Sequence, residues 1–283
     1  MYQSAHECIE SIKSKPYGLY ETLNHVITHY PHYMLNQIGG SIKSITIDSI
    51  EYFYNLSMSF DLNDESENTI NVRIYQFEDK NPCVAFFIDK QNKSVIIEDL
   101  MHYDDCYRHN VKLRNRSLKG TGTIMMKIVI ELCKTFGIKK IELSDRSYYR
   151  CTDGTSTINL SEGHTLSNGV PWYSTFGFLP LFDIDKDRYE YNKRVIERAK
   201  VKDMDWEKLI KKLIKLPHFK KKYNKLFESQ IIPLIETNMN EKFSVFAKYL
   251  MYNYCELFSD MYLEMFNMLG LQQYSKKLMV LYL

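Results

Sequence analysis

The 283-residue chain lacks several features that mark specialised classes of protein. It has no run of about 18 apolar residues, which a membrane-spanning helix would need, and its first residues lack the basic start and apolar core of a signal peptide. Its six cysteines form no Cys-x-x-Cys pair and no Cys/His cluster at zinc-finger spacing. We therefore expect an intracellular, cytoplasmic protein with reduced, unpaired thiols, no metal and no membrane partner.

The chain also lacks a pronounced net charge. Its 37 Lys and Arg residues stand against 35 Asp and Glu, which gives a formal charge of +2. Such a balance does not indicate a nucleic acid, an anionic membrane or an acidic substrate, so any argument from charge must be local. A chain of this length can bury a sizeable core without disulfides or metal.

The first hundred residues are rich in β-type patterns. Helical spacing over Tyr17–Gln37 ends at Gly39-Gly40, and the β-branched and aromatic residues of Ser41–Phe60 then predict one long strand. Turn residues separate the segments that follow, which predicts an antiparallel meander. Its further strands are expected over Thr69–Phe77, Pro82–Asp89 and Ser94–Met101.

A glycine-led helix follows a polar loop over Asp104–Lys119. The Gly120-Thr121-Gly122 turn opens an apolar stripe at helical spacing, which ends near Phe136-Gly137, where glycine suits the left-handed C-terminal position. A short apolar strand follows over Ile138–Leu143. Strand, helix and strand in this order predict a crossover between two parallel strands, and therefore a mixed sheet.

The rest of the chain changes character. A long polar insertion over Arg146–Gly169 is typical of a mobile loop over a site. Beyond Lys200 helical spacing continues to Leu283. We therefore expect an α+β domain over residues 1–195, with helices flanking its sheet, and an all-helical C-terminal region over residues 196–283.

The glycine-led turn also carries chemistry. A pyrophosphate needs backbone N–H donors, and a Gly-x-Gly turn that feeds a helix N-terminus supplies them with a favourable dipole. Taken alone, the turn from Gly120 to Gly122 fits a tight connection equally well.

Two segments resemble the GNAT superfamily of N-acetyltransferases. The stretch RSLKGTGTIMMKIVIELCKTFGIKKIELSD, residues 116–145, is similar to that family's acetyl-CoA-binding motif, and Tyr173–Phe178 is similar to its Tyr-x-x-x-Gly-Phe segment. The resemblance implies a mixed sheet that splays near the end of Ser94–Met101 and admits acetyl-CoA as co-substrate. One departure is Ser117, which stands where the family has Arg or Gln. The implied cofactor-binding residues are Ser117, Leu118, Lys119, Gly120, Thr121, Gly122 and Thr123.

The resemblance implies an enzyme that moves an acetyl group to an amine by direct attack, with Tyr173 protonating the departing thiolate. The reaction also needs a base, and the candidates are Glu98 and Asp99 in the strand before the cofactor loop, with His164 in the polar insertion as a third. A packed aromatic, solvated carboxylates and a surface histidine are the alternative readings. The acceptor amine stays unidentified.

Two features of the C-terminal region suggest other partners. Fifteen Lys/Arg residues stand against six acidic ones over Lys186–Lys225, which fits either a polyanion-binding surface or solvated helix faces. An apolar stripe over Phe243–Met268 fits packing onto neighbouring helices or a homo-oligomer. The alternatives to an enzyme are therefore a catalytically silent GNAT-fold binding protein, or an assembly or nucleic-acid-associated protein that acts through its basic helical tail.

Overall fold

The computed structural model describes residues 42–47, 50–59, 69–75, 84–89, 91–100, 121–135 and 137–283. The chain divides into two compact units: Met1–Leu143 together with Val280–Leu283, and Ser144–Met279. The expected boundary near residue 195 falls inside the second unit. The one or two short helices expected over Tyr17–Gln37 lie outside the described residues.

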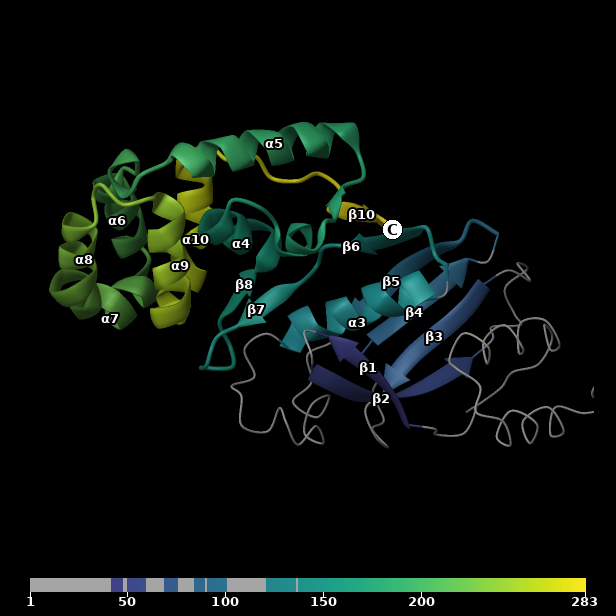
Figure 1. Cartoon of the computed structure of the whole chain (residues 1–283). Helices are drawn as coiled ribbons and strands as arrows, with labels where there is room; N and C mark the ends of the chain where they lie inside the picture. The colour runs from purple at the N-terminus through teal and green to yellow at the C-terminus, as the bar shows by residue number, and fades with distance from the viewer. Residues whose placement is uncertain are drawn as a thin grey trace, which may run out of the picture. The chain divides into compact units, whose positions relative to one another are not determined.

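The first unit contains the predicted antiparallel meander, drawn in Figure 1. Each strand pairs in antiparallel fashion with the next. The single long strand expected over Ser41–Phe60 is instead a hairpin, in which Ile47 lies opposite Ile50. The five strands are β1 (Ile42–Ile47), β2 (Ile50–Ser59), β3 (Thr69–Tyr75), β4 (Val84–Asp89) and β5 (Ser94–Leu100).

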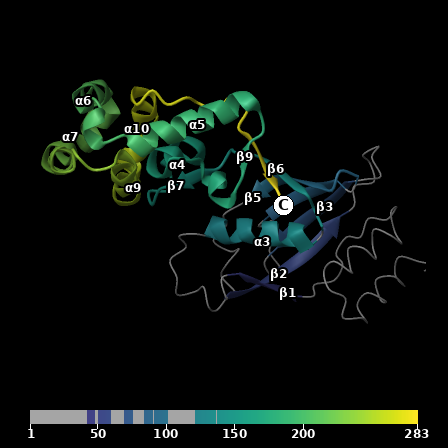
Figure 2. The same cartoon turned by 45° about the horizontal axis from the view of Figure 1, so that its top comes forward.

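The predicted crossover follows the meander. Helix α3 (Thr121–Thr135) leads to β6 (Lys140–Ser144), which pairs with β5 in parallel, so the prediction of a mixed sheet is confirmed. Gly137 ends the helix with a φ of 65°, as expected for glycine at this position. Helix α3 lies against β1 and β5, as both cartoon views show (Figures 1 and 2). Its buried residues include Met125, Met126, Val129 and Cys133.

The pairing of the two parallel strands stops before β5 ends. It runs from Ser94 opposite Lys140 to Ile97 opposite Leu143, whereas β5 continues to Leu100. The last residues of β5 therefore lack this parallel partner. In open α/β sheets, ligands bind outside the carboxyl ends of the strands.

The chain does not end in a helix. Strand β10 (Leu278–Tyr282) follows β6 in the strand order, and Leu283 N–H donates to Lys139 C=O over 3.0 Å. The expectation of an all-helical region to Leu283 therefore misses one strand, although the run LMVLY has the apolar, β-rich composition of one.

The second unit begins with ordered structure where a mobile loop was expected. A hairpin of β7 (Tyr148–Arg150) and β8 (Thr157–Asn159) leads into α4 (Leu160–Asn168). The helix begins at Asn159, whose side chain accepts a hydrogen bond from Ser161 N–H. The expectation was wrong because the buried face of α4 includes small polar residues, so the sequence shows no apolar pattern at helical spacing there. Thr165 and Ser167 satisfy their hydroxyl groups on backbone carbonyls one turn earlier.

The remaining helices share one apolar core with α4, which packs against α5, α9 and α10. The stripe predicted over Phe243–Met268 forms two of them and is largely buried. After the short helix η2 (Trp172–Phe176) and strand β9 (Leu179–Pro180) come α5 (Asp183–Arg198), η3 (Val201–Asp203), α6 (Trp206–Ile214), α7 (Pro217–Leu226), the π-helical η4 (Phe227–Ile231), α8 (Ile232–Thr237), α9 (Phe243–Asn253) and α10 (Cys255–Met268).

A disulfide within the second unit corrects the expectation of unpaired thiols. Cys151 and Cys255 are bonded, with Cα atoms 5.7 Å apart, although 104 residues separate them in sequence. Local cysteine spacing cannot reveal such a pair. Cys133 is a free, buried cysteine, as expected, and burial raises the pKa of its thiol to about 12.

Candidate functional site

A buried polar cluster in the second unit is centred on Asp145, the residue directly after β6. Its side chain is 1% exposed. Oδ1 accepts hydrogen bonds from the Ser147 hydroxyl over 2.7 Å and from the Ser147 N–H over 3.3 Å, whereas Oδ2 is buried without a hydrogen-bond partner. Burying a polar group without a partner costs free energy, so Oδ2 needs an explanation.

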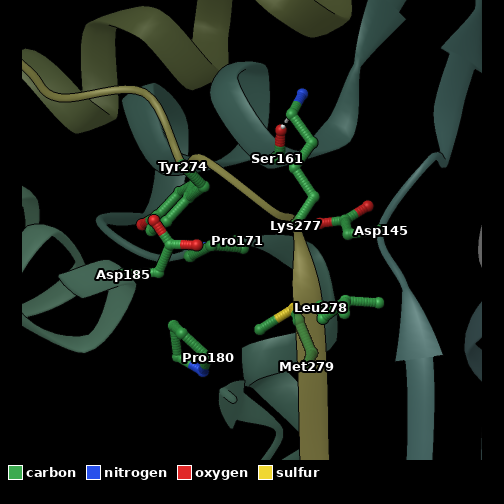
Figure 3. Close-up of a pocket in the computed structure, with 9 residues that line it drawn as sticks. All are labelled: Asp145, Ser161, Pro171, Pro180, Asp185, Tyr274, Lys277, Leu278 and Met279. Atoms are coloured by element: carbon green, nitrogen blue, oxygen red, sulfur yellow. Dashed lines mark hydrogen bonds between the residues drawn. The ribbon is translucent and has the colours of Figure 1, made fainter. Parts of the chain in front are cut away.

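Lys277 lies on the other side of the cluster and contacts it through its backbone and its side chain. Its carbonyl oxygen accepts a hydrogen bond from Asp145 N–H over 2.7 Å. Its Nζ lies 2.8 Å from Oε1 of the buried Glu162 and 3.1 Å from the Ser161 hydroxyl oxygen. Figure 3 shows this side chain reaching toward Ser161, with Asp145 beside it. Lys277 has a φ of 52°, which is uncommon for a residue with a Cβ and is found most often where surrounding contacts enforce it.

Tyr173 belongs to the same cluster. It lies in η2 and is 6% exposed, with ring centroids 4.8 Å from Trp172 and 6.0 Å from Phe178. Burial raises the pKa of the Tyr173 phenol well above its usual range, and the nearby Asp145 carboxylate raises it further. A hydrogen bond with the Ser147 hydroxyl acts in the opposite direction. Tyr173 is therefore both a packed aromatic and a protonated phenol next to a carboxylate.

The environment of Asp145 raises the pKa of its carboxyl group toward physiological pH. Burial raises the pKa of this carboxyl group to about 6, although the Ser147 hydrogen bonds and the positive charge of Lys277 lower it. The charge of Glu162 raises it. A carboxyl group with such a pKa can both take up and release a proton near neutral pH, as acid–base catalysis requires.

A small cavity lies beside this cluster, with Asp145, Ser161 and Lys277 in its wall (Figure 3). It has room for about one water molecule. Its opposite wall includes Asp185, whose two oxygens accept hydrogen bonds from Ser275 and Lys276 and so fix that segment against α5. The cavity can hold a water next to Asp145 but cannot hold a nucleotide.

The structure describes only part of the predicted cofactor turn. Thr121, Gly122 and Thr123 are the first residues of α3, with Gly122 and Thr123 half-buried. The positions outside the described residues are Ser117, Leu118, Lys119 and Gly120. Their role stays a prediction.

The three predicted bases differ in their surroundings. Glu98 is exposed on β5, and the Asp99 backbone pairs with Ala85, while the Asp99 side chain lies outside what the structure describes. His164 is not a loop residue. It lies half-buried on α4, where its Nδ1 is 2.8 Å from the Val170 carbonyl oxygen and burial lowers its pKa. None of the contacts of the described side chains brings Glu98 or His164 to Tyr173.

The basic stretch of Lys186–Lys225 lies on α5, η3, α6 and α7. Several of its side chains form ion pairs with carboxylates, such as Lys212 with Glu264 at 2.6 Å and Lys222 with Glu256 at 3.0 Å. These pairs fit solvated helix faces, and contact with a polyanion stays a prediction.

Asp145 and its partners were missed as candidates in the sequence. Asp145 closes the stretch that resembles the acetyl-CoA-binding motif, and a carboxylate directly after a parallel strand is a recognisable signal. Lys277 and Glu162 are 115 residues apart, and no local pattern joins them.

Comparison with known proteins gives no assignment: no family model matches the sequence, and no curated protein or solved structure is significantly similar to it. Across the described ranges, no three His, Cys, Asp or Glu side chains are grouped so that they could hold a metal ion. None of the helices in the described part of the chain has both the length and the apolar character needed to span a membrane.

Proposed function

We propose that this chain is an acyl-CoA-dependent N-acetyltransferase, which moves an acetyl group from acetyl-CoA to an amine. The observation that carries the proposal is the parallel β5–β6 pair, joined through α3, whose pairing stops at Ile97 and Leu143. Sheets with parallel strands commonly bind their ligands outside the carboxyl ends of those strands. The GNAT-like motif of residues 116–145 covers this same segment of the chain.

Cofactor binding is assigned to the start of α3. The motif places the pyrophosphate at the turn from Ser117 to Thr123, where backbone N–H groups and the helix dipole favour an anion. Gly122 lies in the first turn of α3, and no acidic residue lies in that turn to repel a phosphate. No metal is required for this chemistry.

Proton transfer to the thiolate is assigned to Tyr173. Its burial and its hydrogen bond with Ser147 hold the phenol in one place and keep it protonated. A positioned acid of this kind contributes roughly 10²- to 10⁴-fold to the rate. Attack by the amine forms no covalent enzyme intermediate, so positioning and proton transfer are the tasks that remain for the protein.

Isothermal titration with acetyl-CoA and with CoA tests the cofactor assignment. The chain should bind both ligands saturably, and Gly120→Glu/Gly122→Glu should abolish binding because two carboxylates would occupy the phosphate position. Thr152→Glu is the control for an added carboxylate, since Thr152 lies exposed in a turn of the second unit. Binding that survives in the double variant, or no binding at millimolar ligand, would overturn the proposal.

A second candidate is an acyl-CoA-binding protein without turnover. Ser117, which stands where the family has Arg or Gln, is the observation that favours it, because a weaker phosphate anchor could be kept for binding alone. Saturable acetyl-CoA binding without CoA release in the presence of amines would select this candidate.

A further inference from the structure

Helices α6 and α7 of the second unit carry a run of lysines that the proposed acetyl transfer does not use. From Lys208 to Lys225 the chain has eight lysines and no Asp, Glu or Arg. The two helices are neighbours in sequence and contact each other (Figure 1). We call these eight side chains the lysine surface.

The lysines of α6 share one face of the helix. They are spaced i, i+3, i+4 and i+7, and side chains at these positions lie above one another on an α-helix. Lys208, Lys211, Lys212 and Lys215 are all exposed. The opposite face of α6 packs into the apolar core through Trp206, Leu209 and Leu213. This packing fixes a row of lysines that is about 10 Å long.

Helix α7 extends the same surface. Its exposed lysines are Lys220, Lys221, Lys222 and Lys225. Lys212 of α6 pairs with Glu264 at 2.6 Å, and Lys222 of α7 pairs with Glu256 at 3.0 Å. Both carboxylates lie on α10, about 12 Å apart along its axis. The two groups of lysines therefore border the same helix.

Most of the positive charge of the lysine surface is not neutralised. Carboxylates pair with three of the lysines, since Glu207 pairs with Lys211 in addition to the two pairs with α10. Across the part of the chain that the structure describes, no carboxylate forms an ion pair with the other five, which are Lys208, Lys215, Lys220, Lys221 and Lys225. Like charges this close repel one another, and a bound polyanion would remove that repulsion.

The lysine surface offers charge but little else. Its two aromatic residues, Phe219 and Tyr223, are 1% and 4% exposed, so they cannot stack on the bases of a single strand. Leu216 is the one large apolar side chain that is exposed among the described side chains of Lys208–Lys225. A helix that docks on a membrane inserts an apolar face, and the apolar face of α6 is already buried.

These properties select one kind of polyanion. Double-stranded DNA carries one negative charge for each 1.7 Å or so of its length and binds lysines through its phosphates. Lysine presents a point charge and lacks the planar fork with which arginine reads guanine. Recognition of an RNA duplex depends on contacts to 2′-hydroxyl groups. Asn224, the one side-chain amide of this stretch, already donates to Glu228 over 2.9 Å.

We propose that the lysine surface binds the phosphate backbone of double-stranded DNA without reading its sequence. This inference goes beyond the proposed acetyl transfer and does not depend on it. With five lysines on phosphates, log K should fall against log[salt] with a slope of about −4.5. The affinity should therefore drop about 500-fold between 50 and 200 mM salt.

Fluorescence anisotropy of the full chain with a labelled DNA duplex of mixed sequence and about 20 base pairs tests the proposal. Lys208→Gln/Lys215→Gln/Lys221→Gln removes three lysines that have no ion pair, so no carboxylate is left unpaired and circular dichroism should be unchanged. The affinity of this variant at 50 mM salt should fall about 100-fold, and its salt slope should be shallower by about 3.

A matched control separates the lysine surface from net charge. Lys242→Gln/Lys248→Gln/Lys276→Gln removes the same charge from exposed positions outside α6 and α7, and should keep the wild-type slope. No binding at 50 mM salt, or equal losses in the two triple variants, would overturn the proposal.

Two further probes compare DNA with other polyanions. Tighter binding to phosphatidylserine vesicles, or to an RNA duplex of the same sequence, would overturn the choice of DNA. A chain that binds the DNA duplex but does not bind acetyl-CoA would refute the proposed function and leave this inference standing.

Discussion

The backbone N–H of Asp145 donates a 2.7 Å hydrogen bond to the carbonyl oxygen of Lys277, which brings together two residues 132 positions apart in the sequence. This contact fixes the end of β6 against the segment that leads into β10. Because the Lys277 side chain pairs with the buried Glu162, one residue orders the backbone near Asp145 and also neutralises a buried charge.

Removal of the Lys277 amino group should destabilise the protein through Glu162. Lys277→Met leaves that carboxylate buried and unpaired, which should lower the free energy of unfolding by about 2–4 kcal/mol in urea titrations. Lys277→Met/Glu162→Gln should recover most of the loss, because no charge then remains unpaired. Equal losses in the single and double variants would contradict this role of the ion pair.

Asp145 should make stability depend on pH in an unusual direction. Its pKa is about 6 in the folded chain and near 3.8 when exposed, so between these values the folded state binds more protons than the unfolded state. The stability contributed by this group is therefore present below pH 4 and lost as the pH rises through 6. Asp145→Asn should be more stable than the wild type by about 1–3 kcal/mol at pH 7.5, with little difference at pH 4.

Urea titrations of both chains at the two pH values measure this difference directly. Asp185→Asn is the matched control. Although burial alone raises the pKa of Asp185, its hydrogen bonds from Ser275 and Lys276 and the charge of Arg188 lower it overall, so this variant should lose stability at neutral pH. An Asp145→Asn chain that is less stable at pH 7.5 would show that the ionised form of Asp145 is a stabilising group.

The Cys151–Cys255 disulfide should stabilise the second unit. It closes a loop of 104 residues, for which the loss of chain entropy in the unfolded state predicts about 2–5 kcal/mol. Cys151→Ser/Cys255→Ser should lower Tm and remove the effect of a reducing agent on Tm, whereas Cys133→Ala should leave that effect in place. Two free thiols at these positions in the native chain, measured by alkylation and mass spectrometry, would contradict the pairing.

Gly163 should not tolerate a side chain. A Cβ atom there would lie 2.3 Å from Cγ2 of the fully buried Ile158, so Gly163→Ala should cost about 1–3 kcal/mol of stability. Ile158→Leu removes that branched methyl group, and Gly163→Ala/Ile158→Leu should recover part of the loss in thermal unfolding. A neutral Gly163→Ala variant would show that α4 can move away from β8.

Local patterns in the sequence predicted the first unit well. Strands separated by turn residues, and a glycine-bounded apolar helix between two of them, were sufficient for the meander and the β5–α3–β6 crossover. In the hairpin of β1 and β2, the composition of both strands is so uniform that the turn after Ile47 was missed.

The candidate site of the second unit could not be predicted in the same way. Tyr173 was found through a motif, but Asp145, Glu162 and Lys277 come together only in the fold, and α4 hides its helical period behind buried serine and threonine. The disulfide was not predicted for the same reason: its two cysteines are far apart in the sequence. Because these thiols are paired, unpaired thiols no longer support the expectation of a reducing compartment.

The most direct test of the account is the release of CoA from acetyl-CoA in the presence of spermidine, glucosamine or a lysine peptide. We expect release above background with at least one amine and a loss of about 100-fold or more in Tyr173→Phe. Tyr223→Phe, which changes a buried tyrosine outside the cluster, should show no such loss. Background release with every amine, or equal rates in Tyr173→Phe and the wild type, would contradict the proposed function.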